Sequence, residues 1–73
     1  MDRNEKALHK FGQHLTGLRQ QKNLSVRELA SRSGLDHRQI ARIEAGKVNI
    51  LFSTILALAR GLGITPEELL ECL

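Results

Sequence analysis

The chain has 73 residues, a net charge of +3 with histidine counted as neutral, and a single cysteine, Cys72. A chain of this length forms one domain at most, and it buries only about 60% of the surface that its unfolded form exposes. Because one cysteine excludes an internal disulfide, we expect the fold to depend on well-packed helices, a second subunit, or both.

Charge and hydropathy narrow the class of protein. All 11 Lys and Arg residues lie within positions 1–62, whereas three of the eight acidic residues lie in positions 63–73. A basic body favours a polyanionic partner. The longest apolar run, residues 55–59, is too short to cross a bilayer, and the polar start DRNEK is unlike a secretory signal. We therefore expect a cytoplasmic protein with no membrane partner.

The first predicted helix runs from about residue 5 to Lys22. Its apolar residues recur at intervals of three and four positions, at Leu8, Phe11, Leu15 and Leu18. This spacing places them along one stripe of an amphipathic helix.

Three later segments share one helix-start pattern, in which Ser, Asp or Thr is followed three positions later by Glu or Gln, between two apolar residues. The segments are LSVREL (24–29), LDHRQI (35–40) and ITPEEL (64–69). In such a capping box the first side chain accepts a hydrogen bond from the backbone N–H three residues on, and the Glu or Gln bonds back to the first residue's N–H. The pattern predicts helix starts near Ser25, Asp36 and Thr65.

The second and third predicted helices are joined by a very short turn. The second helix must end by Gly34, which tolerates the left-handed conformation that terminates a helix, and Asp36 already begins the next. Helices joined so tightly cross steeply, and the small side chain of Ala30 permits their close approach. This arrangement is a helix-turn-helix.

The third predicted helix has two different faces. At 100° per residue, one side carries His37, Arg38, Ala41, Arg42 and Ala45, and the other side carries Ile40 and Ile43. Long basic side chains around two alanines suit the major groove of DNA, where the backbone approaches closely and Arg can donate two hydrogen bonds to guanine. The alternative is that these arginines are ordinary solvated residues.

The fourth predicted helix ends at Gly63, and the fifth begins near Thr65. The apolar stripe of the fourth consists of Phe52, Ile55, Leu56, Ala59 and Leu62. Its start has no clear cap, so Asn49 or Ser53 must serve. Sustained strand patterns are absent from the sequence. We therefore predict an all-α fold of five short helices in one domain, residues 1–73.

These features resemble the phage-repressor-like, Cro/CI-type (XRE) family of helix-turn-helix domains. The resemblance covers about residues 9–70, and the matching segments are LRQQKNLSVRELASRSGLDHRQIARIEAGKVN and LALARGLGITPEELL. It implies a five-helix lambda-repressor-like domain that acts as a homodimeric transcriptional regulator. Such a domain binds an inverted repeat in double-stranded DNA with its third helix in the major groove.

The resemblance also implies the contacts with DNA. Residues at and just after the cap of the third helix would contact bases, namely Asp36, His37, Arg38 and Arg42. Phosphates would be contacted from the second helix, the loop after the third and the start of the fourth, namely by Ser25, Arg27, Lys47, Asn49, Ser53 and Thr54. Many family members have a Gln at the position of Val26 that braces the recognition helix on a phosphate, and Val26 cannot do so.

Two further roles are expected within the protein itself. Arg19 and Glu44 match a pair that often forms a structural salt bridge between the first and third helices. Four apolar residues, Ile50, Leu51, Leu70 and Leu73, exceed what the core of so short a monomer can absorb. We predict that these four form a homodimer interface, the alternative being that they cap the core locally.

Other classes of function have little support in the sequence. His9 and His14 are five positions apart and do not share one helical face, so we predict no metal site. The sequence has neither a glycine-rich phosphate loop nor a Ser/His/Asp set. We therefore predict that the protein is not an enzyme and binds no cofactor and no small-molecule effector. The alternative function is a protein-interaction module on the same fold, such as an antitoxin bound to a toxin. Among regulators, a phage repressor, a restriction–modification controller and a general bacterial repressor all fit.

Overall fold

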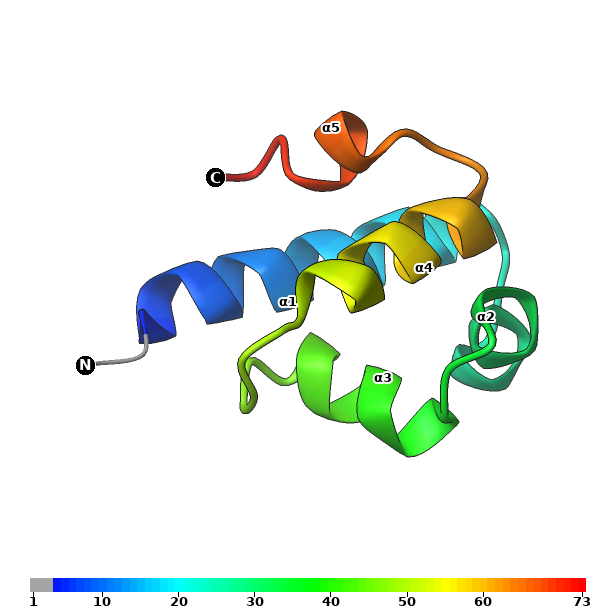
Figure 1. Ribbon diagram of the computed structural model, residues 1–73, viewed down its shortest axis with the longest axis horizontal. Helices are drawn as coiled ribbons and strands as arrows, with labels where there is room; N and C mark the ends of the chain where they lie inside the picture. Colours follow the sequence, from blue (N-terminus) through cyan, green and yellow to red (C-terminus); the bar gives the residue numbers. More distant parts are fainter. Residues whose placement is uncertain (1–3) are drawn as a thin grey trace.

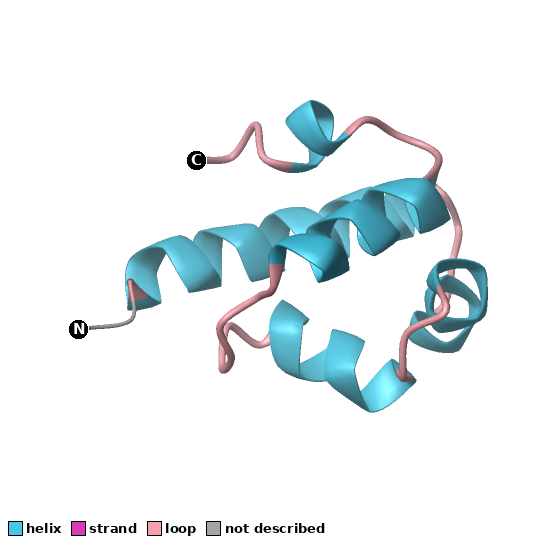
Figure 2. Ribbon diagram, viewed as in Figure 1, coloured by secondary structure: helices cyan, strands magenta, loops and turns pink. Residues whose placement is uncertain are grey.

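The computed structural model describes residues 4–73, which form five helices and no strand (Figures 1 and 2). The helices are α1 (Glu5–Gln21), α2 (Val26–Ser33), α3 (His37–Glu44), α4 (Phe52–Leu62) and α5 (Pro66–Leu69). In Figure 1, α3 lies at one edge of the molecule and α5 at the opposite edge, with α4 between them. The predicted all-α fold of five helices is confirmed.

Two of the three predicted capping boxes form. Ser25 Oγ accepts from the Glu28 N–H at 3.0 Å while Glu28 Oε1 accepts from the Ser25 N–H at 2.8 Å. Thr65 and Glu68 make the same reciprocal pair at 3.1 and 3.0 Å. Each box satisfies N–H groups that a helix start otherwise leaves without an intrahelical partner.

The third predicted capping box does not form, and the predicted hydrogen-bond partner of Asp36 is wrong. Asp36 does cap α3, but its Oδ1 accepts from the N–H of Arg38 at 2.8 Å rather than from that of Gln39. The physical reason is a second interaction, because the guanidinium of Arg38 also binds the Asp36 carboxylate and draws it toward the second residue of the helix.

The fourth helix also departs from expectation. Leu51 occupies the N-cap position without a side-chain hydrogen bond, so neither Asn49 nor Ser53 caps α4. Of its predicted apolar stripe, Phe52 is 73% exposed and Leu56 is 39% exposed. Phe52 occupies the first turn of α4, whereas Ile55, Ala59 and Leu62 of the predicted stripe are buried, as is Leu58.

The last helix is short. It contains only four residues, with Leu70 as its C-cap, so Leu70 and Leu73 lie after the helix rather than on it. Cys72 packs partly against the core, and burial raises the pKa of its thiol.

The core draws one completely buried side chain from every helix. These are Leu15, Leu29, Ile40, Leu58 and Leu69 in chain order. Burying a leucine or isoleucine side chain contributes about 1.5–3 kcal/mol, so the five helices stabilise one another through this shared cluster. The consequence for the surface is that the buried edge of α3 is fixed while its other edge faces solvent.

Candidate nucleic-acid interface

The turn between α2 and α3 sets the direction of α3. Gly34 adopts the left-handed conformation, with φ of 76°, and its N–H donates to the Ala30 carbonyl oxygen at 2.9 Å. The Leu35 N–H donates to the same oxygen at 3.2 Å. The Ser33 hydroxyl is buried and donates to it as well, at 3.3 Å. Three hydrogen bonds to one carbonyl oxygen thus close the end of α2 before α3 begins, as the predicted tight turn requires.

The two edges of α3 differ as the sequence predicted. Ile40 and Ile43 are buried in the core, whereas Arg38, Ala41 and Arg42 are exposed. Ala45, the C-cap residue, is exposed on the same side, and His37 is partly exposed. The result is a rigid helix whose outer edge has basic side chains around small ones.

A partly buried ion pair fixes the far end of α3. Arg19 Nε donates to Glu44 Oε2 at 2.7 Å and Nη2 donates to Oε1 at 3.0 Å, while Nη1 donates to the Leu24 carbonyl oxygen at 2.9 Å. The two charged side chains are only 13% and 11% exposed. The hydrogen bond to Glu44 raises the pKa of Arg19. One guanidinium therefore joins α1, the segment before α2, and α3.

A close backbone approach supports the same end of α3, and the sequence reasoning missed it. A Cβ atom at Gly12 would overlap the carbonyl oxygen of Glu44 and would lie 2.7 Å from that of Ile43. Only glycine allows α1 to approach α3 this closely. The signal in the sequence is a glycine beside the apolar stripe of an otherwise regular helix, where it lowers helix propensity without an evident reason.

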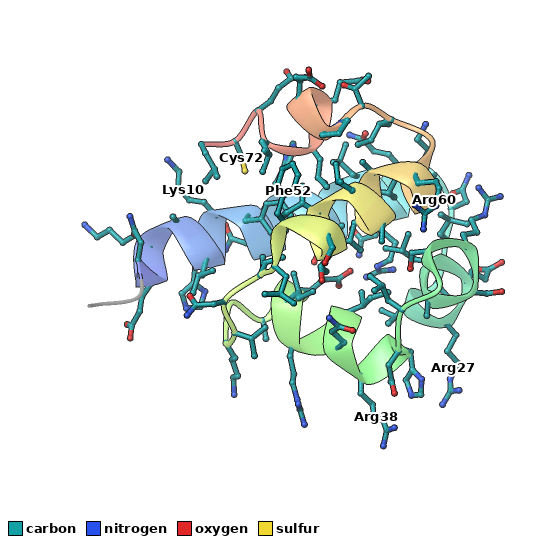
Figure 3. All side chains as sticks on the ribbon, in the orientation of Figure 1. Lys10, Arg27, Arg38, Phe52, Arg60 and Cys72 are labelled. Carbon is teal, nitrogen blue, oxygen red and sulfur yellow. The ribbon has the colours of Figure 1, made fainter. Side chains whose placement is uncertain are left out.

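The start of α3 has a second, exposed ion pair. Arg38 Nε and Nη2 lie 3.2 and 2.9 Å from the two Asp36 carboxylate oxygens, and Nδ1 of His37 lies 3.7 Å from Oδ1. The hydrogen bonds from Arg38 lower the pKa of Asp36 to about 2. Asp36 is therefore ionised throughout the neutral range. In Figure 3, Arg38 and Arg27 extend from α3 and α2 toward the same side of the molecule, away from Lys10.

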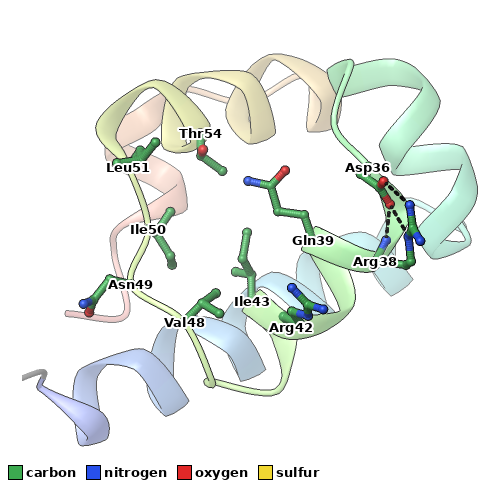
Figure 4. A pocket seen from close by; sticks show the side chains of 10 residues that line it. All are labelled: Asp36, Arg38, Gln39, Arg42, Ile43, Val48, Asn49, Ile50, Leu51 and Thr54. Carbon is green, nitrogen blue, oxygen red and sulfur yellow. Dashed lines mark hydrogen bonds and ion pairs between the residues drawn. The ribbon is translucent and has the colours of Figure 1, made fainter.

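A cleft of about 410 Å³ lies between α3 and the loop that leads to α4 (Figure 4). Its lining combines polar residues of α3 with the apolar loop: Asp36, Arg38, Gln39, Arg42, Ile43, Val48, Asn49, Ile50, Leu51 and Thr54. Gln39 extends into the cleft toward Thr54 in Figure 4. The sequence reasoning did not select Gln39, although its position between the basic and the apolar edge of α3 indicates it.

The residues expected to contact phosphates are not equally accessible. Most of them are exposed, namely Ser25, Arg27, Lys47, Asn49 and Ser53. Thr54 is different, because it is only 5% exposed. Val26 is partly buried against the core, in agreement with its apolar character.

Large apolar side chains outside α3 remain exposed, and one of them, Leu51, also lines the cleft. We call them the exposed apolar set, which consists of Leu51, Phe52, Leu56, Leu70 and Leu73. Ile50, which we had expected to join them, is partly buried against the core instead. Phe52 and Leu56 lie one turn apart on α4, so they share a helical face.

A family model described as helix-turn-helix matches residues 17–69. The chain belongs to the helix-turn-helix family. The match spans the end of α1 and all of α2, α3, α4 and α5, and it confirms the resemblance to Cro/CI-type domains that the sequence indicates.

Curated relatives of this helix-turn-helix chain are regulators. It is 40% identical over 57 residues to the transcriptional regulator PuuR of Escherichia coli (strain K12), covering 78% of the chain and 31% of PuuR. It is 39% identical over 64 residues to the transcriptional repressor RghR of Bacillus subtilis (strain 168), covering 86% of the chain and 47% of RghR. The chain thus spans less than half the length of these two relatives.

Solved structures share the helix-turn-helix fold. The restriction–modification controller protein C.AhdI from Aeromonas hydrophila has a TM-score of 0.83 and 47% identity, covering 85% of this chain and 94% of that one. The hypothetical transcription factor NHTF from Neisseria has a TM-score of 0.82 and 29% identity, covering 93% of this chain and 79% of that one.

Residues 4–73 contain neither a metal-binding cluster nor a membrane-spanning helix. No group of three His, Cys, Asp or Glu side chains in this part of the chain could hold a metal ion. The ring of His14, one of the two histidines considered above, contacts the backbone. Its Nε2 lies 3.2 Å from the Glu68 carbonyl oxygen, and this contact joins α1 to α5. Within the same residues, no helix has the length and apolar character needed to cross a bilayer.

Proposed function

We propose that this chain is a transcriptional regulator that binds a specific sequence of double-stranded DNA with α3 in the major groove. The observation that supports this most strongly is the division of α3 into a buried apolar edge and an exposed basic edge. A helix held from behind by Ile40 and Ile43 presents Arg38 and Arg42 to solvent. Membership of the helix-turn-helix family supports the same proposal.

The proposed contacts with DNA form two groups, one on α3 and one beside it. His37, Arg38 and Arg42 project from the helix itself and would meet base edges, which determine specificity. Ser25, Arg27, Lys47, Asn49 and Ser53 flank the helix and would meet phosphates, which position the protein. We omit Thr54 from this set because its burial leaves little of its hydroxyl accessible.

We further propose that the regulator is a homodimer that binds an inverted-repeat operator. The exposed apolar set supports an interface, because a small monomer gains little from keeping Phe52 and Leu51 in water. A two-fold symmetric dimer presents two copies of α3, and the symmetry of its operator follows from that of the protein.

Among regulators, we propose a restriction–modification controller. C.AhdI supports this choice, since it is 47% identical and the match covers nearly all of its chain, in contrast to the partial matches with PuuR and RghR. The same exposed apolar set also supports an alternative, in which the chain binds a different protein, as an antitoxin binds a toxin.

Selection of duplexes from a random DNA pool, at a stated salt concentration, tests the proposal. We expect an inverted repeat to be enriched by the wild-type chain and lost with Arg38→Ala/Arg42→Ala. Lys6→Ala/Lys10→Ala is the matched control, because it also removes two exposed positive charges, and Lys10 lies on the side of the molecule away from Arg38 (Figure 3). Recovery of a stoichiometric protein partner, with no enriched duplex, would favour the alternative function instead.

A further inference from the structure

The exposed carboxylate at the start of α3 makes three hydrogen bonds to one residue. Asp36 accepts from the backbone N–H of Arg38 at 2.8 Å, from Nε at 3.2 Å and from Nη2 at 2.9 Å. Both carboxylate oxygens are used, as the dashed lines in Figure 4 show. Asp36 is thus a helix cap and a partner of the Arg38 side chain at the same time.

The hydrogen bonds leave a defined part of the Arg38 guanidinium available. A guanidinium has five N–H donors in one plane. Asp36 takes the edge formed by Nε and one N–H of Nη2. The edge formed by Nη1 and the second N–H of Nη2 remains, and it points along the side chain, away from the carboxylate. Two parallel donors of this kind match O6 and N7 of a guanine in the major groove.

The same contacts restrict the motion of an exposed side chain. Arg38 is 76% exposed, so without Asp36 its long side chain would sample many rotamers. A side chain already held in one geometry loses less freedom when it binds, which increases affinity for the ligand that fits that geometry. The Asp36 carboxylate also repels the phosphates of the DNA backbone, and this repulsion is the same for every DNA sequence. The carboxylate can therefore favour one sequence only by its effect on Arg38.

We propose that Asp36 is a positioning residue for base recognition, which holds Arg38 with its terminal edge directed at a guanine. This inference rests on the proposed function, and it replaces the expectation that Asp36 itself contacts a base. Asp36 and Arg38 then act as one unit, and the guanine preference of the protein depends on both residues.

Two substitutions separate the carboxylate from the cap. Asp36→Ser retains an N-cap side chain but removes the carboxylate, and Asp36→Asn retains the shape and one carbonyl oxygen without the charge. Thermal unfolding of both variants measures whether α3 is preserved. Binding to the selected duplex, and to duplexes changed at each half-site position, then measures base preference for each variant with and without Arg38→Ala.

We expect Asp36→Ser to reduce the preference for guanine at one half-site position by about tenfold, within the range that a bidentate arginine–guanine contact contributes. Binding to a scrambled duplex should be unchanged or stronger. In the Arg38→Ala background, Asp36→Ser should not alter base preference. An unchanged preference with Arg38 present would overturn the proposal. An equal loss in both backgrounds would also overturn it, because Asp36 would then contact a base directly.

A measurement without DNA distinguishes this inference from the proposed function. In the NMR spectrum of the free protein, the Nε–H of Arg38 should exchange slowly with water, and Asp36→Ser should accelerate that exchange. If the wild-type chain selected no duplex while this exchange behaved as expected, the proposed function would fail and the Asp36–Arg38 contact would stand. Fast exchange in the wild type would overturn the inference.

Discussion

The helix-turn-helix and the exposed apolar set differ in how many of their groups have partners within the chain. Around α3, the helix starts are capped, and the Arg19 guanidinium donates two hydrogen bonds to Glu44 and one to the Leu24 carbonyl oxygen. At the start of α4, the N-cap residue Leu51 makes no side-chain hydrogen bond, and Phe52 beside it is mostly exposed.

This difference indicates which part of the molecule is complete in a single chain. The helix-turn-helix has its internal partners already, and only its outer edge is open. The exposed apolar set faces water instead. Large apolar side chains in water contribute nothing to the stability of a monomer. One region is therefore a rigid surface for a polar ligand, and the other is suited to a second protein chain.

The largest expected effect comes from breaking the ion pair behind α3. Glu44→Ala leaves the guanidinium of Arg19 partly buried without its carboxylate, which costs about 3 kcal/mol. For a domain of this size, the Tm should fall by about 10 °C or more, as measured by circular dichroism. Glu71→Ala is the control, because it removes an exposed carboxylate that lies outside the helices. A change in base preference at unaltered Tm would instead place Glu44 at the DNA.

The next effect concerns the exposed apolar set. Leu51→Glu or Phe52→Glu should place a charge in the proposed dimer interface and yield monomers at tens of micromolar by light scattering. A dimer binds both half-sites of an inverted repeat at once, and a monomer loses this gain in affinity. The affinity of either variant for an inverted repeat should therefore fall by about 100-fold, while the Tm of the monomer changes little.

Gln20→Glu adds the same charge at an exposed position of α1 and should leave the dimer intact. Wild-type protein that remained monomeric at these concentrations, with and without operator DNA, would contradict the dimer and leave the exposed apolar set to another partner.

Much of the fold follows from local patterns in the sequence. Capping boxes and the 100° spacing of residues act within one helix, so they identify the starts at Ser25 and Thr65 and the opposite placement of Ile40 and Arg42. The basic edge of α3 could be predicted for the same reason, because helix geometry alone separates it from the apolar edge.

The remaining features depend on contacts between distant segments. Gly12 matters because the end of α3 lies against it, and no pattern within α1 specifies that neighbour. Thr54 is buried because α4 turns it toward the protein, although its sequence context fits an exposed helix start. Asp36 binds Arg38 instead of completing a box with Gln39, and the spacing of Asp36 and Gln39 in the sequence does not reveal this competing ion pair.

A smaller effect, on specificity, sharpens the role of the open edge of α3. Arg38→Ala should weaken binding to the preferred duplex by about 10- to 100-fold and relax the preference at one position per half-site, because a bidentate contact with guanine is lost. Binding to a scrambled duplex should weaken much less. The measurement is a titration of both duplexes at fixed salt. Equal weakening of both would assign Arg38 to a phosphate.

The smallest expected effect separates phosphate contacts from base contacts within the same region. Lys47 follows α3, beyond its basic edge, where the chain leaves the helix toward the loop before α4. A lysine there would release counterions from the DNA backbone without contacting a base, so Lys47→Ala should weaken preferred and scrambled duplexes alike. The slope of log K against log salt should become shallower by roughly one unit. Titrations of both duplexes at several salt concentrations measure that slope, and Lys10→Ala, on an exposed part of α1, should leave it unchanged. If Lys47→Ala lost only the preferred duplex at an unaltered slope, Lys47 would contact bases, and the surface that meets DNA would extend past α3 toward the exposed apolar set.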